Sequence, residues 1–176
     1  MNHRKGSAVI EAVLMLPLLL LLFLNTVNAG VYLFAWVTLN NAARAAVEYQ
    51  IYNGVAIGFP QIPTFSSVCR NVWYPDVSSI PSPGTPAPGV CAWPNVSLEI
   101  CSNKNGNISC QWSGSGAPPT LTIPTDPEPA LHTLYVADVA YLYTPLIPVF
   151  TLPIINVPLT FGPTTLHRQV VMRSMQ

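Results

Sequence analysis

Gly6-Ser7-Ala8-Val9-Ile10-Glu11 begins the stretch of sequence that decides how this chain folds. A basic segment at residues 3–5 precedes it, and thirteen consecutive apolar residues follow at positions 12–24. No further Asp, Glu, Lys or Arg occurs before Arg44. About 20 apolar residues are enough for a helix to cross a bilayer. We therefore expect a membrane anchor at residues 12–37, where only a few polar or small residues interrupt the apolar sequence.

The charges that flank this segment predict its orientation and a role for Glu11. Arg4 and Lys5 favour a cytoplasmic N-terminus, so the chain after the anchor is expected to be exported. A carboxylate inside an apolar helix costs about 2.5–3.5 kcal/mol on insertion scales. Glu11 therefore either extends to the cytoplasmic interface or meets a positive partner. Cleavage after Gly6 would create such a partner, the α-amine of Ser7, and Glu11 would become the fifth residue of the shortened chain.

These residues resemble those of a known family. Residues 6–11, the apolar run Leu14–Leu20 and the segment Leu39–Ala46 resemble the TadE-like pseudopilins of the bacterial Tad (Flp-type) pilus system. The resemblance covers about residues 4–52. It implies that a prepilin peptidase cuts after Gly6 and that Glu11 is needed for processing or assembly. It also implies other pilin or pseudopilin subunits, the bacterial inner membrane and the pilus assembly machinery as partners.

Three classes of function follow from the N-terminal sequence. The favoured one is a structural or assembly role, as a minor pilin or pseudopilin that reaches the pilus or cell surface. The second is a permanently anchored binding or adhesive module, because some relatives remain uncut and this chain has Ala12 where Tad pilins often have an aromatic residue. The third is a secreted protein, because Val27-Asn28-Ala29 is similar to a signal-peptide cleavage site. A mature N-terminus at Ser7, Met1 or Gly30 would distinguish these classes.

The anchor is expected to continue as a helix that supports the exported domain. We predict one helix over residues 7–53, about 69 Å long from Ser7 to Tyr52 at 1.5 Å per residue and bent near Pro17. Helical spacing places five residues on one face that can pack against the domain: Leu39, Ala42, Ala43, Ala46 and Tyr49. Asn53-Gly54 is a helix-termination signal.

Proline distinguishes the remaining sequence. Eighteen of the nineteen prolines lie from Pro60 to Pro163, which argues against further long helices. We expect residues 60–94 to be rich in loops. The length of 176 residues leaves room for one domain after the anchor, so the predicted division is a cytoplasmic leader at 1–6, the helix at 7–53 and an exported β domain at 54–176.

Residues 96–112 are predicted to form a β-hairpin. Apolar and polar residues alternate on both sides of Asn105-Gly106, the strongest two-residue hairpin turn signal. A turn centred there pairs Lys104 with Asn107 and Cys101 with Cys110, at a separation within disulfide reach. By elimination Cys69 pairs with Cys91. Metal binding is the rival interpretation of the cysteines, but the sequence has no Cys-x-x-Cys pair and export favours disulfides.

Two later segments complete the predicted sheet. Residues 134–143 are rich in β-formers and almost entirely apolar, as in a central strand, and residues 164–173 are predicted to form an edge strand. Asp138 interrupts the central strand, and we expect it to be a buried carboxylate paired with Arg168 or Arg173. Residues 146–155 are apolar but contain two prolines, so the sequence is compatible with two alternatives, a short helical turn and a membrane-facing loop. The predicted fold class is α+β, with an antiparallel sheet of about three to five strands.

Composition and motifs argue against several functions. The seven basic and seven acidic residues balance, and no basic patch appears, so nucleic acid is not an expected partner. The three histidines are far apart, and no nucleophile elbow, phosphate loop or acidic metal cluster occurs. We therefore expect no catalytic residues, no cofactor and no metal, and we do not expect the protein to be an enzyme.

Overall fold

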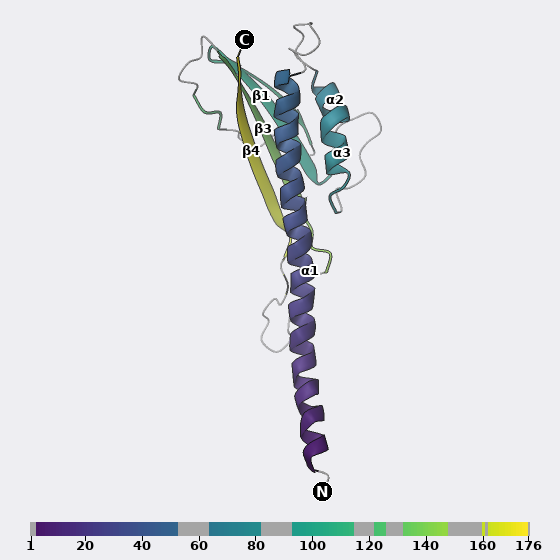
Figure 1. Ribbon diagram of the computed structural model, residues 1–176. Helices are drawn as coiled ribbons and strands as arrows, with labels where there is room; N and C mark the ends of the chain where they lie inside the picture. The colour runs from purple at the N-terminus through teal and green to yellow at the C-terminus, as the bar shows by residue number, and fades with distance from the viewer. Residues whose placement is uncertain are drawn as a thin grey trace. The chain divides into compact units, whose positions relative to one another are not determined.

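The computed structural model describes residues 3–52, 64–81, 93–114, 122–125, 132–147, 160 and 162–175 (Figure 1). Helix α1, His3–Tyr52, comprises 50 residues and is therefore about 75 Å long at 1.5 Å per residue. Pro17 lies inside this helix, which continues on both sides of it. Tyr52 is the last residue described in the helix, and the predicted termination signal Asn53-Gly54 lies outside the described residues. The sequence thus predicted the long N-terminal helix correctly, although the helix begins four residues before Ser7.

The chain divides into two compact units, and α1 contributes to both. Unit 1 contains Met1–Leu33 and Thr144–Pro163, and unit 2 contains Phe34–Tyr143 and Thr164–Gln176. Each unit is described separately below. The predicted division into a leader, a helix and an exported domain stays a prediction.

Unit 2 contains a four-stranded antiparallel sheet (Figure 1). The strands are β1 (Val96–Lys104), β2 (Asn107–Ser113), β3 (His132–Tyr143) and β4 (Thr164–Met175), in the order β2-β1-β3-β4. The apolar strand β3 is central, and seven successive residues of it are buried. β4 lies at one edge of the sheet. The α+β class, the central strand and the edge strand are as predicted.

The β1–β2 hairpin has the register that its turn predicts. Lys104 pairs with Asn107, and Cys101 pairs with Cys110. Asn105 and Gly106 have φ angles of 54° and 81°, the left-handed values that a type I′ turn requires. Gly106 N–H also donates to Asn103 Oδ1 at 3.1 Å. The turn residues therefore fix which side chains face each other along the whole hairpin.

The second half of α1 buries a stripe of small apolar residues in unit 2. The buried residues recur every three or four positions: Ala35, Leu39, Ala42, Ala43, Ala46 and Val47. Small side chains let the helix backbone approach its neighbours closely. Arg168 on β4 joins the sheet to the helix, because its Nε donates to Asn40 Oδ1 at 2.8 Å and its guanidinium lies 5.9 Å from the centre of the Trp36 ring.

Residues 65–77 correct the expectation of a loop-rich region. They form α2 (Phe65–Val68), the π-helical turn η1 (Cys69–Trp73) and α3 (Tyr74–Val77) in direct succession. Pro75 has no N–H to donate to the preceding turn, and it lies at the start of α3, directly after the π-helical turn. Val68, Cys69, Trp73 and Val77 are buried on one side of the segment. Burial of this face stabilises the helix despite its proline.

The end of this segment is tied to the sheet by Tyr141. Its hydroxyl donates a hydrogen bond to the carbonyl of Pro81. Burial, with a smaller contribution from Tyr143, raises the pKa of Tyr141 to about 12. The phenol therefore keeps its proton and remains a donor throughout the physiological pH range.

Candidate functional site

The predicted processing and assembly residues lie in the first turns of α1. Gly6, Ser7 and Glu11 are all helical. Ser7 and Glu11 are four residues apart, so they lie on the same face of the helix with a rise of about 6 Å between them. The Glu11 side chain is exposed, and no hydrogen bond or ion pair joins it to another residue in the part of the chain that the structure describes.

The surface of α1 that follows Glu11 is almost entirely apolar. The helix is long and apolar enough to cross a membrane, as judged by its length and composition. The large exposed apolar side chains in the first half of the helix include Ile10, just before Glu11, and then Val13, Met15, Leu16, Leu18, Leu19, Leu20, Leu22 and Phe23. An apolar surface of this extent is not usual on a water-soluble monomer. A membrane anchor is one role that this helix could serve.

Asn28 makes a polar contact in unit 1 that was not predicted from the sequence. Its side chain is 1% exposed. Asn28 Nδ2 donates to the Ile147 carbonyl at 3.2 Å, and Asn28 Oδ1 accepts from the Ile147 N–H at 3.1 Å. Thr26, by contrast, donates to Leu22 in its own helix at 2.8 Å. An Asn in an apolar helix was the only sequence signal for this long-range contact, and Asn25 gives the same signal although its Nδ2 donates to the Leu21 carbonyl in its own helix.

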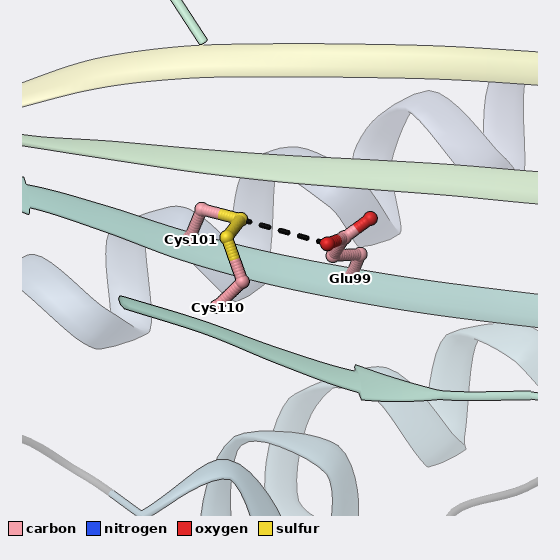
Figure 2. A group of neighbouring side chains, drawn as sticks. All are labelled: Glu99, Cys101 and Cys110. Carbon is pink, nitrogen blue, oxygen red and sulfur yellow. Dashed lines mark hydrogen bonds between the residues drawn. A yellow bond between two sulfur atoms is a disulfide. The ribbon is translucent and has the colours of Figure 1, made fainter. Parts of the chain in front are cut away.

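A second group of side chains lies on one face of the sheet in unit 2 (Figure 2). Cys101 and Cys110 form a disulfide across the β1–β2 pair, with their Cα atoms 4.0 Å apart. The structure thus contains the bridge that the hairpin register predicts. Cys69 is buried and disulfide-bonded, whereas Cys91 lies outside the described residues. The Cys69–Cys91 pairing therefore stays a prediction.

Glu99 lies beside this disulfide, on the same face of β1 (Figure 2). Its Oε1 is 3.7 Å from Cys101 Sγ. Because a disulfide sulfur carries no hydrogen, this is a packing contact and not a hydrogen bond. Glu99, Cys101 and Cys110 have the atom spacing of a metal site, but metals bind thiolates, and both sulfurs are joined in the disulfide. The oxidised protein therefore has only the carboxylate to offer at this place.

Glu99 also faces a second buried carboxylate. Antiparallel pairing sets it directly opposite Asp138, and the two side chains are 7% and 1% exposed. Desolvation, reinforced by the charge of Asp138, raises the pKa of Glu99. Glu99 Oε2 and Trp112 Nε1, which belong to a cross-strand pair, are both buried without a hydrogen-bond partner among the described residues. This buried part of the sheet therefore contains polar atoms that lack hydrogen-bond partners among the described residues.

The partner of Asp138 is His167, which corrects the expectation of an arginine. His167 Nε2 donates to Asp138 Oδ2 at 2.8 Å, while the imidazole remains half exposed. Side chains alternate between the faces of a strand. Arg168 pairs with Val139 and therefore faces away from Asp138, whereas Arg173 pairs with Leu134, about 13 Å further along the sheet at 3.3 Å per residue.

Unit 2 also has an open cleft between the end of α1, α2 and the β hairpin. Its volume is about 300 Å³, and it is lined by Gln50, Thr64, Phe65, Ile100, Ser102, Ser109 and Gln111. Every lining side chain is uncharged. This composition can support contacts with a polar surface, and none of these described lining residues is an acid or a base suited to catalysis.

Comparison with known proteins finds a similarity in the N-terminal part of the chain. No curated protein and no solved structure significantly matches the chain. The family model described as "TadE-like protein" matches residues 6–48, which include the Gly6–Ser7 motif, Glu11 and most of α1. TadE-like proteins are components of Tad pilus systems and not an enzyme family. Over residues 6–48, therefore, the chain is similar to TadE-like proteins.

Proposed function

We propose that this chain is a minor pilin or pseudopilin that takes part in assembly of a Tad-type pilus. The observation that carries the proposal is the continuity of α1. One helix contains the TadE-like motif, the apolar surface from Ile10 onward and the stripe from Ala35 to Val47 that is buried in unit 2. Such a helix can hold a folded domain to a membrane and later to a helical bundle of similar subunits.

In this proposal the helix spans the bacterial inner membrane with residues 1–6 in the cytoplasm. Arg4 and Lys5 favour that orientation, and the sheet of unit 2 is then exported. An oxidising compartment agrees with the disulfide between Cys101 and Cys110. The partners are a prepilin peptidase, other pilin or pseudopilin subunits and the assembly machinery in the membrane.

Glu11 is assigned the central role in assembly. Cleavage after Gly6 leaves the amine of Ser7 at the start of a helix, where the helix dipole also favours a nearby carboxylate. When subunits pack with an axial offset, Glu11 of one subunit can reach the Ser7 amine of the next. The attraction is larger in low dielectric than in water, and it offsets desolvation only when the pair forms. A subunit in the wrong axial register would retain an unpaired charge in apolar surroundings.

A permanently anchored binding module is the second candidate. The feature that favours it is the uncharged cleft of about 300 Å³ in unit 2, whose hydroxyl, amide and apolar side chains can contact a ligand. N-terminal sequencing of the protein isolated from membranes and from sheared pili distinguishes the two functions. Ser7 as the first residue supports the pilin, an intact Met1 supports the anchored module, and Gly30 would contradict both.

A further inference from the structure

Asn28 binds both backbone polar groups of Ile147, a residue 119 positions away. The side-chain amide of Asn28 thus donates to the carbonyl of Ile147 and accepts from its N–H. Asn28 belongs to α1, and Ile147 belongs to the segment Thr144–Pro163, which forms unit 1 together with the first half of that helix. This segment leaves the end of β3 and returns to the start of β4.

The position of Asn28 along α1 places this contact at the depth of the bilayer. A hydrocarbon core of about 30 Å corresponds to about 20 helical residues. When the apolar span begins at Ala12, it therefore ends near Val31, with Asn28 about 4.5 Å inside its outer boundary. Backbone groups at that depth cannot bind water and need a partner within the protein. The paired hydrogen bonds of Asn28 supply that partner to Ile147.

The residue next to Ile147 has the character of a lipid contact. The Leu146 side chain is 66% exposed, and Leu22, Phe23 and Leu33 of the same unit are also exposed. The whole segment 144–163 contains no Asp, Glu, Lys, Arg or His. An uncharged segment with an exposed leucine at this level of a membrane helix suits acyl chains better than water.

We propose that the segment at Leu146–Ile147 enters the outer leaflet of the inner membrane beside α1, with lipid acyl chains covering Leu146. The proposal rests on the membrane span assigned to α1 under the proposed function. Asn28 is the positioning residue that holds the segment at this depth. The exported domain would then have two attachments to the bilayer, the helix itself and this segment.

The test uses the full-length chain in membranes that contain a phospholipid with an alkyne-tagged acyl chain. A benzophenone amino acid replaces Leu146, Leu20 or Ile108 in separate proteins. Leu20, on the apolar span, is the positive control, and Ile108, exposed on β2, is the negative control. After irradiation, the expected yield of lipid-bound protein at position 146 is comparable with that at position 20 and several-fold above that at position 108.

The two control positions distinguish failure of the inserted segment from failure of the membrane span. A lipid adduct at position 20 combined with none at position 146, or with an adduct to protein there, overturns the inserted segment but leaves the membrane span intact. Absence of lipid at position 20 contradicts the membrane span itself and with it the proposed function.

Two variants test the positioning role of Asn28. Asn28→Leu keeps the helix apolar but removes both hydrogen bonds to Ile147, so the lipid adduct at position 146 should fall several-fold while that at position 20 is unchanged. Thr26→Val is the matched control, since Thr26 donates only within its own helix. It should leave both yields unchanged. Equal yields at position 146 in the wild type and in Asn28→Leu would overturn the role of Asn28.

Discussion

Glu99 on β1 and Asp138 on β3 lie directly opposite each other in the sheet, and both carboxyl side chains are buried. The charge of Asp138 therefore acts on Glu99 where little water screens it, and desolvation adds to the effect. His167 contacts Asp138 and Trp112 pairs with Glu99 across the strands, yet Glu99 Oε2 has no partner among the described residues. The sheet thus contains one carboxylate whose charged form is unfavourable.

Stability should consequently decrease as the pH rises. Because the pKa of Glu99 is raised in the folded protein, the folded state binds its proton more tightly than the unfolded chain does. The protein is then most stable below the ordinary pKa of a glutamate, and stability is lost as the pH rises through the raised pKa. Glu99→Gln should be more stable than wild type at neutral pH and similar to it at acidic pH, as measured by urea unfolding in detergent.

A control variant separates this effect from general loss of charge. Glu48 lies on the surface of α1 and pairs with exposed Arg44 at 2.7 Å. Glu48→Gln should change stability by no more than about 0.5 kcal/mol. If Glu99→Gln instead destabilises the protein at neutral pH, the Glu99 carboxylate has a favourable partner, and its charged form is not unfavourable in the folded protein.

The disulfide between Cys101 and Cys110 closes a short loop, with a sequence separation of 9. The chain-entropy relation assigns about 2–3 kcal/mol to such a loop and about 3–4 kcal/mol to one the length of Cys69–Cys91. Replacing Cys101 and Cys110 by serine should therefore lower the free energy of unfolding less than replacing Cys69 and Cys91. Peptide mapping without reduction checks the pairing first. A peptide that joins Cys91 to Cys101 would contradict both the register and the predicted second bridge.

The hairpin turn depends on a glycine with φ +81°. A Cβ at Gly106 meets no atom within 4 Å, so the cost of a side chain there is conformational and not steric with neighbours. Gly106→Ala should destabilise the protein by about 1–2 kcal/mol. Asn105→Gly, at the other left-handed position, should be close to neutral because asparagine already tolerates φ 54°. Equal effects of the two variants in thermal unfolding would show that the turn does not govern the stability of the hairpin.

The buried stripe of α1 should tolerate no larger side chains. Ala43 is fully buried in unit 2, whereas Asn41, two residues earlier, is exposed. Ala43→Leu should cost about 1–3 kcal/mol through overpacking, and Asn41→Leu should cost little. Protease resistance of unit 2, measured on the full-length chain in membranes, reports the difference. Equal resistance of the two variants would contradict packing of this half of the helix in the domain.

Local signals explain which parts of this fold were predictable. Asn105-Gly106 determines the hairpin register because the turn alone fixes the cross-strand pairs. Apolar composition and helical spacing likewise determine α1. Residues 65–77 were missed because prolines argue against a helix, and tertiary burial of Trp73 outweighs them. No local rule relates His167 to Asp138, which depends on the β3–β4 register, or Asn28 to Ile147, 119 residues apart.

Pilus recovery from a Glu11→Gln strain tests most directly whether Glu11 acts between subunits. Cells carrying the wild type, Glu11→Gln or Glu11→Asp are fractionated, sheared pili are quantified, and the N-terminus of the membrane form is sequenced. Membrane insertion of Glu11→Gln should equal or exceed that of wild type, because a costly charge is removed. Its N-terminus should still be Ser7, while incorporation into pili or pilus output should fall strongly, with Glu11→Asp intermediate. A Glu11→Gln protein that is cleaved at Gly6 and assembles like wild type would contradict the account and leave Glu11 as a residue that only extends to the membrane interface.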